Sequence, residues 1–195
     1  MAPRSAITPS SPKQVSFIPA DPYTYVGEGV QILDVSTPAF SGQVLIHNNE
    51  TCIPVAGPLG TGPGGGTSMW DVTDPGTPSF IVTVSITGTS AGPRPSRQTH
   101  KNQWDCDTGY AFLISSVDGW RSPRVMQVFD LNDPARPVHV RDWNLWENAP
   151  GAVDAPEDRV GGNGLHQPML VGDRLFAPYG MNNGGVVQIL DFEKL

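Results

Sequence analysis

A short apolar phrase ending in aspartate occurs four times along the chain and limits the folds that the chain can adopt. The copies are residues 30–36 (VQILDVS), 67–75 (TSMWDVTDP), 125–134 (VMQVFDLNDP) and 186–192 (VVQILDF). Repetition of one structural unit is typical of solenoids, propellers and arrays. Because the copies are rich in β-branched and aromatic residues, they are predicted to be strands. The sequence therefore predicts an all-β fold, a β-propeller built from four blade-like repeats.

The residues after each phrase predict a hairpin. The third copy continues into the turn 132–137 (NDPARP) and then the apolar stretch 138–143, and the second continues into 73–78 and then 80–84. Aspartate and asparagine side chains bind the backbone two residues further on, and proline presets the turn's φ angle. Because proline cannot donate to a central ladder, these segments are predicted to connect strands.

The spacing of the phrases predicts where loops are inserted. Their aspartates fall at positions 34, 71, 130 and 191, and the two longer intervals contain Gly-, Pro- and charge-rich stretches, 88–98 and 146–164, that are predicted surface loops. Residues 1–14 are expected to be a flexible segment, and residues 15–195 to form the propeller. The ring is expected either to close alone, with 15–18 as the last outer strand, or to be completed by a second chain in a homodimer.

Composition and charge exclude several partners. The formal net charge is -7 and no cluster of Lys or Arg occurs, which argues against nucleic acid and anionic membrane surfaces. No run approaches the roughly 18 apolar residues of a spanning helix, so membrane insertion is not expected. Residues 1–14 lack the apolar segment of a signal peptide. The cysteines, Cys52 and Cys106, are compatible with one disulfide or with two thiols, so the compartment stays open.

The amino-acid sequence of the repeat resembles that of a known protein family. Residues 31–36 (QILDVS) and 127–134 (QVFDLNDP) are similar to the repeat of the LVIVD-repeat β-propeller proteins of bacteria and archaea. The resemblance extends over residues 23–192 and implies a propeller fold. It also implies that an extracytoplasmic location is frequent among similar proteins. It implies no particular activity, because members of the family are mostly uncharacterised.

Three histidines hold comparable places in successive repeats. These are His47, His100 and His166. If successive blades present them at the mouth of a central channel, they form a site for a transition metal, because imidazole suits Zn, Cu and Fe. The alternative is that each histidine binds the backbone of the neighbouring blade and holds the blades in register. The cofactor is therefore either one of these metals or none.

Further polar and aromatic residues accompany these histidines. Residues of the kinds that favour binding surfaces are predicted to contact a small molecule or a protein, namely Trp104, Asp105, Arg121 and Gln167. Acidic residues occur in the same predicted loops, namely Glu50, Asp105, Asp107 and Asp118. The acidic residues are either metal ligands or general bases beside the imidazoles, or they are caps of turns.

Three interpretations are compatible with these features, one of them a purely structural surface repeat. The favoured interpretation is a propeller module that binds a small molecule or a protein at its channel face. The alternative is a metal-dependent enzyme, an oxidoreductase or a hydrolase, with histidine ligands from successive blades. No His-Glu-x-x-His motif occurs, and the sequence assigns no catalytic residue. Whether the protein is an enzyme stays open, because propellers serve binding and catalysis alike.

Overall fold

The structure is a computed structural model, and it describes residues 13–19, 25–26, 28–50, 66–84, 99–105, 107–117, 119–122, 124–153, 164–180 and 185–195. In these residues the regular structure consists of twelve β-strands and two short 3-10 helices, Trp146–Asn148 and Phe192–Lys194. The predicted all-β fold is confirmed. Within the same ranges, no helix is long and apolar enough to cross a membrane.

The first sheet is built around one long strand, β3 (Ser41–Glu50). The first half of β3 pairs with β2 (Gln31–Ser36), and its end pairs with the two-residue strand β1 (Tyr25–Val26). Strand β3 also pairs with β4 (Thr67–Asp71), which in turn pairs with β5 (Ser79–Val84). All these pairings are antiparallel, so the sheet is a meander with one extra short strand.

The second and third sheets are also antiparallel meanders. Their strand orders are β6-β7-β8-β9 and β10-β11-β12, so strands that follow one another in sequence are neighbours in space. The strands of the second sheet are Asn102–Trp104 (β6), Tyr110–Ser115 (β7), Val125–Asp130 (β8) and Val138–Trp143 (β9). Those of the third are Met169–Val171 (β10), Arg174–Tyr179 (β11) and Val186–Asp191 (β12).

The four copies of the repeated phrase all form strands, but they do not take the same position. The second, third and fourth copies form β4, β8 and β12, each the third strand along its sheet. The first copy forms β2, which is the first strand along the order β2-β3-β4-β5. The first and second copies therefore share one sheet, and the described residues form three sheets.

The predicted turn chemistry is confirmed in the first and second sheets. Four aspartates accept a hydrogen bond from the backbone N–H two residues further on, in the pairs Asp71 with Thr73, Asp74 with Gly76, Asp130 with Asn132, and Asp133 with Ala135. The strand before each turn is irregular at the same place in the phrase, between Met69 and Trp70 and between Val128 and Phe129. The two hairpins therefore repeat one another in detail.

The second sheet packs between the other two because its strand β7 is apolar on both faces. Leu113 belongs to a core shared with the first sheet, where it joins Ile46, and Phe112 belongs to a core shared with the third sheet, where it joins Leu175. All four side chains are fully buried. Successive side chains of a strand point to opposite faces, and each such burial is worth about 1.5–3 kcal/mol. The two cores therefore hold the three sheets together.

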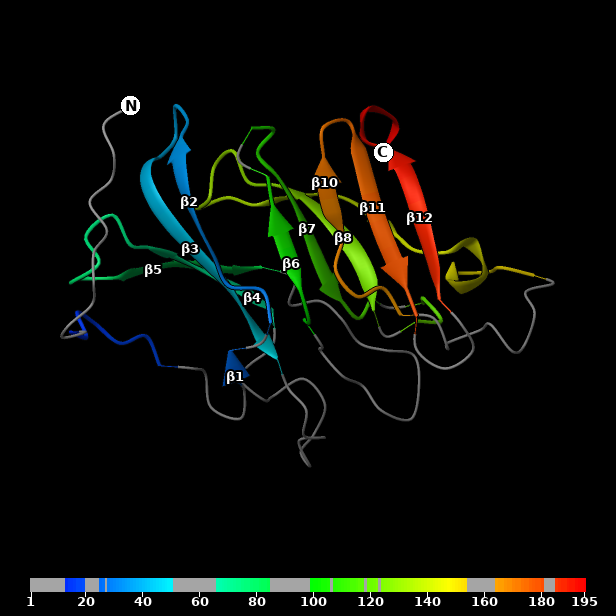
Figure 1. Cartoon of the computed structure of the whole chain (residues 1–195), viewed down its shortest axis with the longest axis horizontal. Helices are drawn as coiled ribbons and strands as arrows, with labels where there is room; N and C mark the ends of the chain where they lie inside the picture. Colours follow the sequence, from blue (N-terminus) through cyan, green and yellow to red (C-terminus); the bar gives the residue numbers. More distant parts are fainter. Residues whose placement is uncertain are drawn as a thin grey trace, which may run out of the picture.

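Figure 1 shows the three sheets side by side in chain order, with β2, β6 and β10 pointing the same way. Two glutamines join these first strands from sheet to sheet. Gln31 Oε1 accepts a hydrogen bond from the Trp104 N–H at 2.9 Å, and Gln103 Oε1 accepts one from the Leu170 N–H at 2.8 Å. The residues that precede β2, β6 and β10 therefore lie at the same end of the sheets.

Candidate metal centre

Three side chains with metal-binding atoms precede the first strands of the three sheets. Glu28 and His100 each lie three residues before a bridging glutamine, and His166 lies three residues before β10. These are corresponding places in successive sheets. The repeat of the fold therefore brings together residues that are far apart in sequence.

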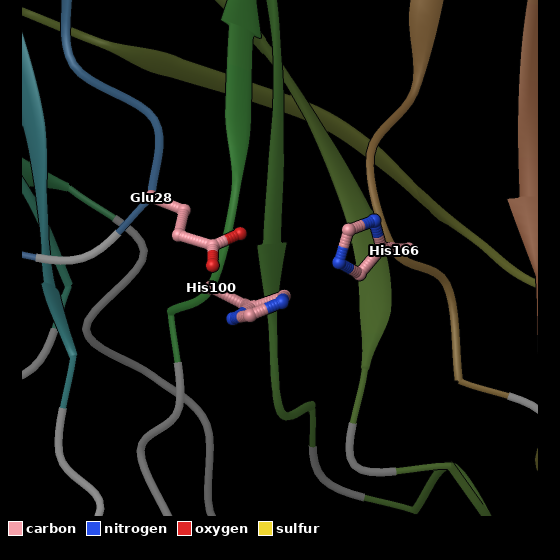
Figure 2. A group of neighbouring side chains, drawn as sticks. All are labelled: Glu28, His100 and His166. Atoms are coloured by element: carbon pink, nitrogen blue, oxygen red, sulfur yellow. The ribbon is translucent and has the colours of Figure 1, made fainter. Parts of the chain in front are cut away.

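The three side chains converge on one small region. Ligand atoms of Glu28, His100 and His166 all lie within 4.8 Å of one another. Figure 2 shows the Glu28 carboxylate and the His166 ring extending toward His100 from separate segments. The rings of His100 and His166 meet edge to face, with centroids 5.1 Å apart. Zinc lies about 2.0–2.2 Å from nitrogen and oxygen ligands, so the three ligand atoms are near enough to one another to be candidates for holding one ion.

His100 is the anchored member of the group. The residue is 8% exposed, and its Nδ1 lies 2.8 Å from Oε1 of Glu50, which is also buried. Because the carboxylate accepts this bond, the proton of the neutral imidazole is on Nδ1 and the lone pair is on Nε2. That Nε2 is buried and has no hydrogen-bond partner among the described residues. A carboxylate behind one imidazole nitrogen with the other left free is the arrangement of a metal-binding histidine.

Asn48 joins the segments that carry two of the three ligands. This fully buried side chain donates from Nδ2 to the backbone carbonyl of Glu28 at 3.3 Å and to that of His100. Its Oδ1 accepts from the Asn102 amide at 2.8 Å. Gly29 has a φ of +140°, and a Cβ there would lie 3.0 Å from Asn48 Nδ2. The close packing of amides around Gly29 therefore holds Glu28 beside His100.

Positive charge surrounds the group. Lys101 Nζ lies 2.6 Å from Glu28 Oε2, and the Lys101 side chain is only 15% exposed. The hydrogen bond and the charge of Lys101 lower the pKa of the Glu28 carboxyl. The pKa of the His166 imidazole is lowered as well, first by partial burial of the side chain and then by the positive charges of Lys101 and Arg124. Both residues are therefore favoured in the forms that bind metals, carboxylate and neutral imidazole.

His47 does not join the two histidines with which it was predicted to act. The Nε2 of His47 accepts a hydrogen bond from Trp70 Nε1 at 3.2 Å, and the residue lines a pocket together with Phe80. The next residue, Asn48, is the one that reaches His100, and successive residues of a strand face opposite ways. The place expected for His47 is taken by Glu28.

The four residues predicted to contact a ligand are dispersed. Trp104 is 3% exposed and belongs to the core between the first and second sheets. Asp105 caps a turn, accepting from the backbone N–H and the hydroxyl of Thr108 at 2.9 and 2.6 Å. Arg121 is exposed, and Gln167 is half-buried directly after His166. The predicted acidic residue that does meet an imidazole is Glu50, whereas Cys52, Cys106 and Asp118 lie outside the described residues.

Sequence reasoning missed Glu28, Lys101 and Asn48. One signal for Glu28 is present in the sequence: Glu28 precedes Gln31 by the same three residues that separate His100 from Gln103. The residue at this position is glutamate in the first repeat and histidine in the second. A search for repeated histidines therefore does not find Glu28. No known family model matches the chain, and no curated protein sequence is significantly similar to it.

Proposed function

We propose that this protein is a β-propeller-type module of the LVIVD-repeat kind that binds a divalent transition-metal ion through His100, His166 and Glu28. The observation that carries the proposal is the state of His100. Its imidazole is buried and oriented by Glu50, its Nε2 has no hydrogen-bond partner among the described residues, and the residue lies in one cluster with the other two ligands. A buried polar atom is costly to leave unpaired, and an ion supplies the missing partner.

The ligand set narrows the class of ion. Two imidazoles and one carboxylate suit Zn, Fe and other first-row divalent ions, whereas Mg and Ca prefer oxygen ligands alone. Structural zinc sites are closed by four protein ligands, but catalytic sites use three and keep a position open. Here the described residues supply three candidate ligands, and two of them, Glu28 and His166, are exposed. The ion would therefore be accessible from solvent.

This openness favours metal-dependent catalysis, by oxidation or hydrolysis, as a second candidate function. A bound ion with a free position polarises an oxygen or activates a water molecule. The propeller part of the proposal is supported by three meanders lying side by side, with corresponding glutamine bridges between their first strands. Binding of a small molecule at this end of the sheets is common to both candidate functions.

Elemental analysis tests the metal site. Untagged protein purified without chelator, and reconstituted with Zn, Fe or Cu, is expected to hold about one ion per chain. The double variant H100A/H166A is expected to hold none while keeping the β-sheet circular dichroism spectrum. His139→Ala is the matched control, because His139 is an exposed histidine paired with Asp142 on β9. Full metal content in the double variant, or none in the reconstituted wild-type protein, would contradict the proposal.

A further inference from the structure

Two cationic residues lie on segments that adjoin the ligands of the candidate metal centre. Lys101 Nζ lies 2.6 Å from the Glu28 carboxylate, on the stretch that also carries His100. Arg124 approaches from the start of β8: its backbone carbonyl accepts from the Leu165 N–H at 3.3 Å. Its side-chain carbons lie against Gly164, where an added Cβ would be 3.2 Å away.

The carboxylates of the candidate metal centre already have partners. Glu28 forms an ion pair with Lys101, and Glu50 contacts Nδ1 of His100. Among the described residues, the Arg124 side chain has no carboxylate partner within salt-bridge distance. Charge that is partly desolvated in this way is stabilised by an anion.

We infer that the ion takes a small oxyanion, a carboxylate or phosphate group of the substrate, with Lys101 and Arg124 as the residues that position it. The inference rests on the proposed metal site. One oxygen of the oxyanion would occupy the open coordination position, and a second oxygen would accept from the ammonium or the guanidinium. The planar guanidinium matches the oxygens of both carboxylates and phosphates. A neutral ligand would form no ion pair with either cationic residue.

Cobalt substitution makes the inference testable, because the visible spectrum of Co²⁺ reports directly on its ligands. Inorganic phosphate and acetate are titrated separately into the cobalt protein at constant ionic strength. At least one is expected to change the spectrum with saturation, and the comparison identifies which oxyanion is preferred. K101M and R124M are each expected to weaken that binding by about tenfold, the loss of one charge-assisted hydrogen bond. Arg121→Met, which removes an exposed arginine of the same charge, is expected to leave it unchanged.

The possible results distinguish a failure of the proposed metal site from a failure of the proposed oxyanion binding. If the wild-type protein gives no cobalt spectrum, the metal site itself is refuted, and the inference with it. If the cobalt spectrum is present but neither oxyanion alters it, only the inference is overturned. Wild-type oxyanion affinity in both K101M and R124M, with full cobalt content, would also overturn it. Equally tight oxyanion binding by the metal-free protein would show that the ion takes no part.

Discussion

At the scale of single residues, the candidate site depends on how one imidazole is held. Glu50 contacts His100 at Nδ1, on the side away from the proposed ion. Such a carboxylate orients the ring and increases the basicity of the nitrogen that binds the metal. Glu50 is therefore as much a part of the site as the residues that would touch the ion.

Glu50→Gln tests this role. The amide can still accept a hydrogen bond but carries no charge, so the affinity for zinc is expected to fall about 10–100-fold with the fold unchanged. Competition with a chromogenic chelator measures the affinity. Asp142→Asn is the matched control, because Asp142 pairs with the exposed His139 at the same distance of 2.8 Å. Equal affinities in the Glu50 variant and the wild type would show that the contact is only structural.

Tyr179 makes stability depend on pH at the alkaline end. It is 3% exposed, and burial, followed by the charge of Glu147, raises the pKa of its phenol above the ordinary value of 10.0. Above that pH the unfolded chain loses this proton before the folded chain does, so the stabilising contribution is complete below pH 10 and is lost as the pH rises. Urea unfolding at pH 9 and pH 11 is expected to show a smaller decrease in stability for Tyr179→Phe than for wild type. The same decrease in both would contradict the assignment.

At the scale of elements, the connection before β7 depends on a backbone conformation that strongly favours glycine. Gly109 precedes β7 with a φ of +77°, and a Cβ there would lie 2.5 Å from Oδ1 of Asn132 in the turn after β8. The asparagine is itself fixed by the Asp130 carboxylate, which accepts from its backbone and side-chain N–H groups. The turn therefore has little freedom to move away.

Gly109→Ala is expected to destabilise the protein by more than the about 1–2 kcal/mol that a left-handed conformation costs a non-glycine residue. Gly172→Ala separates the two contributions: Gly172 has a φ of +60°, but nothing lies within 4 Å of an added Cβ. Chemical denaturation of both variants measures the difference. Equal losses would show that the turn relaxes around the new methyl group.

The positions of the strands could be predicted from the sequence, but the contacts that their side chains make could not. The repeated phrase correctly predicted strands at 67–71, 125–130 and 186–191, because its composition and its turns are determined locally. Side-chain direction at the end of β3 could not be predicted, since His47, Asn48, Asn49 and Glu50 are all buried and show no alternation. That is why His47 was expected in the site, whereas Asn48 and Glu50 are the residues that contact His100.

At the scale of the whole molecule, the site exists only while the sheets keep their relative positions. Each sheet contributes one ligand, and the bridges from Gln31 and Gln103 link the strands that follow those ligands. The two hydrophobic cores hold the sheets together, but apolar packing is not directional. The hydrogen bonds therefore determine the register in which the ligands meet.

Gln103→Ala is expected to reduce stability by about 1–3 kcal/mol, because the Leu170 N–H loses its acceptor. It is also expected to weaken metal binding, although Gln103 is not a ligand, since His166 lies on the segment that the bridge holds. Gln43→Ala is the control, because Gln43 makes an exposed hydrogen bond to Asp34 within one sheet. Denaturation and metal titration measure both effects. Unchanged metal affinity in the Gln103 variant would contradict the coupling.

The glutamine bridges have a consequence for how such a site can change. Each accepts from a backbone N–H, so the junction requires no particular side chain on the next strand, which has Trp104 in one case and Leu170 in the other. The position three residues upstream is glutamate in the first sheet and histidine in the second, with the same junction after it. The contacts between the sheets therefore do not depend on which side chain occupies positions 28, 100 or 166. A metal ligand can be substituted at any of these positions while the glutamine bridges are kept. Substituting Asp, Cys or His there one at a time is a direct way to change which ion the protein selects.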